Sequence, residues 1–299
     1  MADAASRKTD DRLRLALPKG RMFDGVRALL DDAGIPLARS GRDYRPRLGL
    51  PGCAVKLLKP QNIVEMLDLG SRDVGFAGAD WAEELDVELV ELCDTGLDPV
   101  RIVAAAPSVL APDGALPERG LGGRQLIVAS EYERITRQWM QRRGIDGRFV
   151  RTYGATEVFP PEDADIIVDN TATGATLEAN ALVIVDEVRR SSTRLYASKE
   201  AMANAARRAR VEDFTLLVRA VLEARRRVMI EVNVAADKLD ALLEVLPCMR
   251  KPTIAELAEA GGFAVKAAVE RPELPRVIPA IKAAGGTDIV VSRPSQIVP

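Results

Sequence analysis

The most informative absence in this chain is histidine, which occurs at none of its 299 positions. A Ser-His-Asp or Cys-His nucleophile therefore cannot be built from this sequence, and neither can a histidine general base or a histidine-ligated zinc site. Any catalysis has to rest on lysine, arginine, carboxylates, hydroxyls and backbone groups.

Cysteine and long apolar runs are also scarce. The three cysteines, Cys53, Cys93 and Cys248, are odd in number and far apart, which predicts reduced thiols and argues against a disulfide framework or a closed zinc site. No apolar run approaches the length of a bilayer span, and residues 1–11 are polar and charged, without the apolar core of a secretory signal. We therefore expect a cytoplasmic protein.

Neither sign of charge dominates, since 42 lysines and arginines stand against 44 aspartates and glutamates, a net charge of -2. This balance does not favour nucleic acid or a membrane surface as a partner. A chain that is 47% hydrophobic and 29% charged has an ordinary globular composition, and its length allows two or three domains.

Two cations follow the first expected strand. Residues 12–17 alternate in polarity as a strand does, and residues 26–33 have the spacing of a helix that stops at Gly34. Lys19 and Arg21 lie between these elements, at the end of a strand where α/β proteins bind ligands. Two cations there would suit phosphates, although charges on a solvated loop explain them equally well.

The same alternation of strands and helices continues through both halves of the chain. In the first half of the chain we expect strands at 55–58, within 73–78, at 89–92 and at 100–106. Further strands are expected at 126–129, 149–151, 166–168, 183–185 and 194–197. In the first half of the chain, this order predicts a largely parallel sheet with helices on both faces. The glycines at 75 and 78 form no dinucleotide fingerprint, and the sequence contains no P-loop motif.

The stretch 164–177 reads ADIIVDNTATGATL and is the strongest candidate for a binding loop. A buried strand ends at Asp169 and passes into small and hydroxyl residues, whose backbone N–H groups can bind a phosphate. Asp169 itself would suit sugar hydroxyls or a metal ion. Alternatively, Thr171, Thr173 and Thr176 are N-cap residues of an ordinary strand-to-helix turn. The absence of bulky side chains in this loop favours the ligand interpretation.

Three arginines at 225–227 mark the start of a third region. From residue 228 to residue 291 the expected order is β-α-β-β-α-β, as in a ferredoxin-like domain. Such small domains bind effectors or build oligomers in other enzymes, which is an argument from fold alone.

Eight short motifs together resemble one known family. They are LPKGR at 17–21, DVGFAGAD at 73–80, ASEY at 129–132, GATEV at 154–158, DNTATGATL at 169–177, EANAL at 178–182, LP at 246–247 and PT at 252–253. Their order is similar to that of the long form of ATP phosphoribosyltransferase, which opens histidine biosynthesis. The resemblance runs from about residue 13 to residue 291.

The resemblance implies two periplasmic-binding-protein-like α/β lobes followed by a ferredoxin-like, ACT-like domain. Together with the expected strands, it predicts a first catalytic lobe of residues 12–105 and 190–224. A second lobe, with the phosphoribosyl loop, would span 106–189, and a regulatory domain would span 225–299.

The activity implied by the resemblance is transfer of the phosphoribosyl group of phosphoribosyl pyrophosphate to N1 of ATP, with release of pyrophosphate and with Mg²⁺ as cofactor. This is the committed step of L-histidine biosynthesis. Long-form members are hexamers, or dimers in equilibrium with hexamers, and are inhibited by histidine. For this chain the resemblance predicts those two substrates, histidine as an allosteric inhibitor and a homo-hexamer, with no nucleic-acid or membrane partner.

The resemblance also assigns site residues, although it assigns no metal ligands. Those expected to be catalytic are Lys19, Arg21, Lys59 and Asp169. The phosphoribosyl pyrophosphate loop would comprise Asp169, Thr171, Ala172, Thr173, Gly174, Ala175, Thr176 and Leu177. Weaker assignments to the nucleotide are Asp80, Tyr132 and Glu157. For Asp80, a helix N-cap role is an equal alternative.

The chain departs from the family pattern at Lys59, where arginine is frequent. Lysine keeps the charge but loses the planar fork that binds a phosphate through two parallel hydrogen bonds. Ala181 replaces a usual glycine. Two other functions stay open: a different phosphoribosyltransferase with the same loop, and a cytoplasmic non-enzymatic small-molecule binder with the same two-lobed fold.

Overall fold

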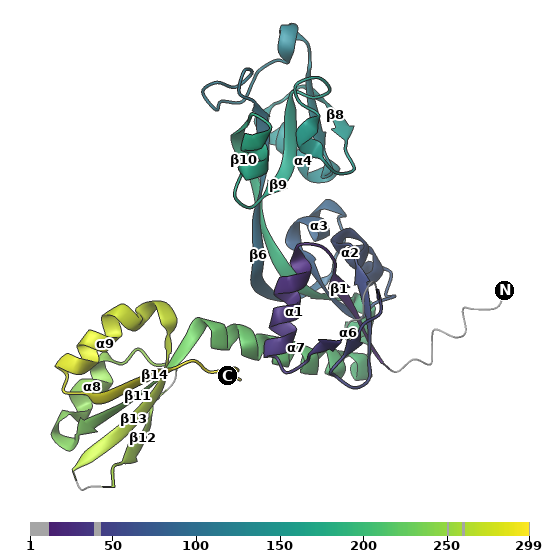
Figure 1. Ribbon diagram of the computed structural model, residues 1–299. Coiled ribbons are helices and arrows are strands. Elements are labelled where there is room, and N and C mark those ends of the chain that lie inside the picture. The colour runs from purple at the N-terminus through teal and green to yellow at the C-terminus, as the bar shows by residue number, and fades with distance from the viewer. Residues whose placement is uncertain (1–11, 39–42, 250, 259–260, 299) are drawn as a thin grey trace, which may run out of the picture. The chain divides into compact units, whose positions relative to one another are not determined.

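The computed structural model describes residues 12–38, 43–249, 251–258 and 261–298 (Figure 1). The polar stretch 1–11, on which the prediction of no secretory signal depends, lies outside the described residues. By its internal contacts the chain divides into two compact units. The first contains the described residues up to Arg27 and Leu37–Val211, and the second contains Ala28–Pro36 and the residues from Glu212 onward.

The first unit is built on an eight-stranded sheet in the order β4-β1-β5-β10-β6-β9-β7-β8. The strands are β1 (Leu13–Pro18), β4 (Cys53–Leu58), β5 (Val74–Gly78), β6 (Val90–Pro107), β7 (Leu126–Ser130), β8 (Gly147–Arg151), β9 (Ile166–Thr171) and β10 (Leu182–Ala197). The outer strands on each side pair in parallel, whereas β10 pairs antiparallel with β5 and β6, and β6 pairs antiparallel with β9.

The parallel pairing predicted for the first half of the chain is found in β4, β1 and β5 but not in β6, which pairs antiparallel with both of its neighbours. The segments 89–92 and 100–106, expected as two strands, belong to the single 18-residue strand β6, and 183–185 and 194–197 belong to β10. Figure 1 shows these two strands running together from one lobe of the unit to the other. They pair directly as an antiparallel ribbon and need no crossover helix.

Seven helices flank this sheet or leave it among the described residues. They are α1 (Met22–Asp32), α2 (Pro60–Asp68), α3 (Ala79–Glu84), α4 (Glu133–Arg143), α5 (Ala175–Ala179), α6 (Lys199–Ala203) and α7 (Ala205–Arg226). Pro60 in the first turn of α2 and left-handed Gly144 after α4 mark a helix start and a helix end in the usual way. A short hairpin, β2 (Leu37–Ala38) with β3 (Arg47–Leu48), completes the first unit.

Arg14 is the polar residue in the alternating pattern of β1, and it pairs with a residue distant in sequence, Asp73. Leu13, Leu15 and Leu17 are buried, while the guanidinium of Arg14 lies 2.5 Å from the carboxylate of Asp73, which is 1% exposed. Asp73 also accepts the backbone N–H of Arg14 at 2.7 Å. This paired and hydrogen-bonded charge sits next to β5 and fixes the start of that strand against β1.

The second unit holds a four-stranded antiparallel sheet in the order β12-β13-β11-β14. Its elements are β11 (Arg227–Ala235), α8 (Leu239–Val245), β12 (Thr253–Glu256), β13 (Gly262–Glu270), α9 (Leu274–Ala283) and β14 (Thr287–Ser292). Alternate residues of β11 pack with Leu242, Val277 and Ile281 of the two helices in one buried cluster. The predicted β-α-β-β-α-β order is confirmed, and with it the predicted α/β class with a ferredoxin-like C-terminal domain.

Within the described ranges, no helix is both long enough and apolar enough to cross a membrane. The three cysteines are free thiols, each partly buried. The lobe boundaries expected at 105/106 and 189/190 stay predictions, because β6 and β10 pass through those positions without interruption.

Candidate active site

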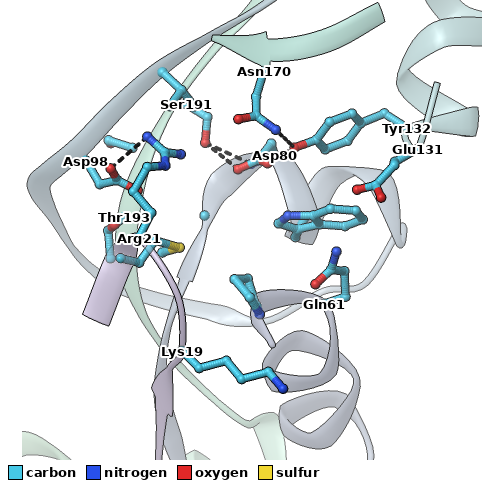
Figure 2. Close-up of a pocket in the computed structure, with 16 residues that line it drawn as sticks. Lys19, Arg21, Gln61, Asp80, Asp98, Glu131, Tyr132, Asn170, Ser191 and Thr193 are labelled. Atoms are coloured by element: carbon cyan, nitrogen blue, oxygen red, sulfur yellow. Dashed lines mark hydrogen bonds and ion pairs between the residues drawn. The ribbon is translucent and has the colours of Figure 1, made fainter. Parts of the chain in front are cut away.

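A cavity of about 240 Å³ opens in the first unit, where several strand ends and helix starts meet. Its wall comes from the loop after β1, from the starts of α2 and α3, from β6, β9 and β10, and from the segment before α4 (Figure 2). Four of the predicted site residues line it: Lys19, Arg21, Asp80 and Tyr132. The fold thus brings these four residues together, although Lys19 and Tyr132 lie 113 positions apart in sequence.

Asp80 is the best-connected polar residue of this wall. Its side chain is 5% exposed and accepts hydrogen bonds from the Ser191 hydroxyl at 2.6 Å and from the Tyr132 hydroxyl at 2.9 Å. The backbone N–H of Asp80 donates to the same Ser191 hydroxyl at 3.1 Å. The residue at the N-cap of α3 is Gly78, so the alternative of Asp80 as the N-cap residue is not what the structure shows.

Glycine is required immediately before α3. A Cβ atom on Gly78 would lie 2.2 Å from the Asp80 carboxylate, which folds back over this position. At Gly75 a Cβ would come within 2.8 Å of Ile63 and 3.1 Å of Ala16. The two glycines of the DVGFAGAD motif therefore allow close packing around Asp80 and β1, which explains them without a dinucleotide.

Tyr132 and Trp81 form the aromatic side of the cavity. Their ring centroids are 4.7 Å apart with the planes tilted by 32°. Burial, together with the neighbouring Asp80 carboxylate, raises the pKa of the Tyr132 hydroxyl well above its ordinary value, so this group is a neutral donor at every physiological pH. Asn170 in turn donates its side-chain amide to the Tyr132 oxygen at 3.1 Å.

A second carboxylate on α3 fixes the element that carries Tyr132. The buried Glu84 side chain accepts the backbone N–H groups of Arg134 at 3.1 Å and Ile135 at 3.0 Å, which lie in the first turn of α4. A carboxylate is favourable at that end of a helix. Burial is the main reason that the pKa of Glu84 is raised. One face of α3, at Asp80 and Glu84, thus holds both Tyr132 and the start of α4.

Lys19 and Arg21 follow β1 at its carboxyl end. The backbone N–H of Lys19 donates to the carbonyl of Leu58 at 2.9 Å, which ties the loop to β4, and its ammonium lies 5.7 Å from the ring centroid of Tyr44. The half-exposed Arg21 guanidinium lies 2.8 Å from the carboxylate of Asp98. This contact is made by Nη1, and a guanidinium has five N–H donors, more than this one contact uses.

Asp169 does not line the cavity but lies beside residues that do. The sequence predicted that the strand ends at Asp169. In the structure β9 continues to Thr171, so Asp169 lies within the strand. Burial raises the pKa of the Asp169 carboxyl from 3.8 to about 6, and the negative charges of Glu131 and Glu157 add to this effect. Its oxygen accepts the backbone N–H of Asn170 at 2.7 Å.

The predicted phosphate loop is held by its own hydroxyls. Thr171 Oγ1 accepts the N–H of Gly174 at 2.9 Å, and Thr173 Oγ1 lies 3.4 Å from the N–H of Ala175. Gly174 has φ 89°, and α5 behind it has only five residues. The N–H groups of Thr176 and Leu177, in the first turn of α5, have no partner within that helix. The loop therefore shows both expected features: local hydroxyl contacts and backbone donors that a ligand could use.

Two other predicted residues lie outside the cavity wall. Lys59 is exposed and forms the N-cap of α2, whereas its neighbours Pro60 and Gln61 line the cavity. Glu157 is half-buried in a single turn of 3₁₀ helix, Thr156–Val158, and acts on Asp169 through its charge.

Sequence reasoning missed several residues of the wall. Those with polar side chains that lie outside the eight motifs are Gln61, Asp98, Ser191, Ser192 and Thr193. A usable signal was the hydroxyl run at 191–193, inside what is otherwise a strand. Glu131 and Asn170, which lie within two of the motifs but have no predicted role of their own, also line the cavity.

The residues present can be compared with what magnesium requires. In the part of the chain that the structure describes, no three His, Cys, Asp or Glu side chains are grouped so that they could hold a metal ion. Mg²⁺ usually keeps several waters and binds through one or two carboxylates plus substrate phosphates. The carboxylates near Asp169 fit an ion of that kind, carried by a phosphorylated substrate.

A two-lobed α/β sheet, a cavity lined by cations and a buried acid, and an antiparallel C-terminal domain are typical of proteins that bind phosphorylated small molecules. Comparison with known proteins makes this more specific. The family model of ATP phosphoribosyltransferase (HisG) matches residues 59–220, and the model of the HisG C-terminal domain matches residues 224–293. The chain belongs to the ATP phosphoribosyltransferase family, transferases of histidine biosynthesis, in its long form.

Individual relatives agree with this assignment. The chain is 33% identical over 294 residues to the ATP phosphoribosyltransferase of Pelotomaculum thermopropionicum, covering 96% of this chain and 100% of the relative. The enzyme of Solibacter usitatus is also 33% identical, over 93% of this chain and 96% of its own length. A solved chain of the ATP phosphoribosyl transferase (HisG:HisZ) complex from Thermotoga maritima superposes with a TM-score of 0.60 at 25% identity, covering 71% of this chain and 98% of that one.

Proposed function

We propose that this chain transfers the phosphoribosyl group of phosphoribosyl pyrophosphate to N1 of ATP and releases pyrophosphate. The observation that carries the proposal is the cavity in which Lys19, Arg21 and the buried Asp80 meet, in a chain of this family. Two cations suit the phosphates of both substrates, and a buried acid suits ribose hydroxyls or the adenine amino group.

The chemistry needs little proton transfer from the protein. Adenine N1 is largely unprotonated at neutral pH and can attack C1 of the ribose directly, which is compatible with a chain that lacks histidine. The residues would align N1 with C1 and stabilise the departing pyrophosphate and an oxocarbenium-like sugar. In this proposal Lys19, Arg21 and Lys59 face pyrophosphate or the ATP phosphates, and Asp80 contacts the nucleotide.

In this proposal the loop after β9 would bind phosphoribosyl pyrophosphate. Asp169 would hold the ribose hydroxyls, and the N–H groups of residues 172–176 would bind the 5-phosphate together with the hydroxyls of Thr173 and Thr176. Glu157 and Tyr132 are assigned to the nucleotide side. When bound, Mg²⁺ would neutralise charge on the phosphates. Asp169 is the carboxylate of this region that would hold it.

We also propose regulation by histidine, a homo-hexamer and a cytoplasmic location. Support for the first two comes from the matched HisG C-terminal domain at residues 224–293, which is characteristic of the long form in the resemblance described above. The lobe boundaries 12–105 with 190–224, and 106–189, are proposed on the same basis.

One assay tests the activity. Purified protein is mixed with ATP, phosphoribosyl pyrophosphate and Mg²⁺, and both pyrophosphate release and the N1-linked adduct are measured. Formation of both products supports the proposal, and omission of Mg²⁺ should abolish their formation. Product from another base, but none from ATP, would point to a different phosphoribosyltransferase. Binding of either compound without turnover would favour the non-enzymatic binder, and histidine added to the same assay tests the inhibition.

A further inference from the structure

Thr193 of β10 has a hydroxyl without a hydrogen-bond partner among the described residues. Its side chain is 1% exposed, and Thr193 Oγ1 makes no hydrogen bond to any residue that the structure describes. A buried hydroxyl without a partner destabilises a folded protein. Thr193 nevertheless belongs to the wall of the cavity of the proposed active site.

The backbone around Thr193 is fixed on both sides. Thr193 pairs with Gly78 of β5 and with Leu97 of β6, and its carbonyl accepts the Thr95 hydroxyl at 2.6 Å. The register between β10 and β6 shifts immediately before and after Thr193. Such irregularities re-aim side chains and are frequent next to active sites.

The residues next to this position determine what kind of group could bind there. Leu97, which pairs with Thr193, is followed by Asp98, whose backbone has φ 50° and whose carboxylate holds Arg21. Figure 2 draws Thr193, Arg21 and Asp98 on the same side of the cavity, opposite Tyr132 and Glu131. An aspartate in the left-handed region is uncommon, and backbone outliers of this kind gather at functional sites.

We propose that Thr193 is a substrate-binding residue whose hydroxyl donates a hydrogen bond to a phosphoryl oxygen. The inference rests on the proposed function and adds a residue to it. A phosphoryl oxygen is favoured over a base or sugar because Arg21, on this side of the cavity, is the group that a phosphate would contact first. The hydroxyl stays unpaired in the free protein and is paired in the complex.

Thr136 provides a control, because it has a buried hydroxyl of the same kind away from the cavity. Thr136 of α4 is 0% exposed, its Oγ1 also has no partner among the described residues, and it is not part of the cavity wall. Thr136→Val and Thr193→Val make the same chemical change, loss of an unpaired buried hydroxyl at constant volume. They differ in that Thr193 belongs to the cavity wall, whereas Thr136 does not.

The test measures stability and ligand binding for both variants. Thr136→Val and Thr193→Val should each melt at the wild-type temperature or above it. Thr193→Val alone should weaken binding of inorganic pyrophosphate in calorimetry, and raise the KM of a phosphate-bearing substrate, by about tenfold, the loss of one hydrogen bond to a charged group. Thr193→Ser keeps the hydroxyl and should restore both values, while Thr136→Val should change neither.

Two results would overturn the proposal. In the first, Thr193→Val binds pyrophosphate and turns over substrates like the wild type. In the second, Thr193→Val melts well below the wild type with unchanged binding, so that the hydroxyl is part of the fold. If Thr193→Val does not fold, Thr193→Ala gives the same readings. Should the wild type fail to join ATP and phosphoribosyl pyrophosphate, the proposed function fails, and pyrophosphate and ATP calorimetry still decide the role of Thr193.

Discussion

The cavity around Asp80 and the loop after β9 are two candidate anion-handling regions that are held in opposite ways. Asp80 is buried, and its partners Tyr132 and Ser191 lie 52 and 111 residues away in sequence. In the loop, the closest side-chain contact joins Thr171 to Gly174, three residues on, and most of the side chains are exposed. The first region is set by the whole sheet, while the second is set by its own residues.

Substitutions in the two regions should therefore differ in how they affect protein stability and substrate binding. A change in the Asp80 network should disturb both the fold and the substrate, because the same hydrogen bonds serve both. A change in the loop should disturb the substrate with little effect on the fold, because few buried groups depend on it. The expected effects of four substitutions follow, in decreasing size.

Asp80→Asn should have the largest combined effect on stability and activity. An asparagine in place of Asp80 turns an NH₂ group toward the Tyr132 or Ser191 hydroxyl and leaves a buried donor unpaired, which should lower the free energy of unfolding by about 1–3 kcal/mol. Because both partners line the cavity, kcat/KM should also fall about 100-fold, or about 2.7 kcal/mol. Denaturant titration and steady-state kinetics measure the two quantities.

Exposed Asp113 offers a matched control, since Asp113→Asn removes the same charge at a position outside the cavity wall. That variant should resemble the wild type in both measurements. If Asp80→Asn lost activity but kept full stability, the network would not be the shared anchor described above.

Arg21→Ala should lower turnover strongly and leave the fold intact. Losing one charge-assisted contact to a phosphate in the transition state should cost about 2–4 kcal/mol, by analogy with loss of an oxyanion donor. Arg21 is half-exposed, and its ion pair with Asp98 should contribute no more than about 1 kcal/mol to stability. Kinetics with both substrates, together with a melting curve, test this. Near-normal activity would remove Arg21 from the mechanism.

The same contrast explains how much could be predicted from sequence. The β-α-β-β-α-β tail could be derived because its strands and helices have regular periods and local turns. The loop with Thr171 and Gly174 could be derived because its contacts span three residues. The hydroxyl run at 191–193 is visible in the sequence, but the roles of Ser191 and Thr193 could not be derived, because they depend on pairing with strands about a hundred residues earlier.

The long strands escaped prediction for a related reason. Polar and turn-forming residues at 94–99 interrupt the apolar pattern of β6, so the segment has the composition of two strands with a loop between them. The structure keeps it as one strand because β10 pairs along most of its length. Local propensity was overridden by tertiary pairing.

Asp169→Asn should stabilise the protein at high pH. The folded-state pKa is raised from 3.8 to about 6 by burial, so the native state binds the proton more tightly than the unfolded state, and stability falls as pH rises from about 4 to about 6. Above pH 6 the charge should cost about 1–2 kcal/mol after allowance for solvent screening. Asparagine avoids this cost, and the difference from wild type should vanish near pH 4.

Urea titrations of both proteins at pH 4, 6 and 8, without ligands or Mg²⁺, measure this effect. The variant should be the more stable protein at pH 8 and should still lose catalysis, since the charge of Asp169 is proposed to serve the substrate. Equal stability at all three values would contradict the raised pKa.

Gly174→Ala tests the loop with the smallest expected change. At φ 89° an alanine is strained, and a Cβ there would meet no atom within 4 Å, so the cost is backbone strain alone, about 1 kcal/mol. Because the loop is locally held, it can relieve this strain by shifting, which should raise the KM for phosphoribosyl pyrophosphate several-fold with little change in melting temperature. Gly122→Ala, at φ 72° and equally open, is the matched control and should leave KM unchanged. If both variants melted lower to the same extent and neither altered KM, Gly174 would be an ordinary turn glycine. The loop would then be the strand-to-helix turn that its threonines also permit.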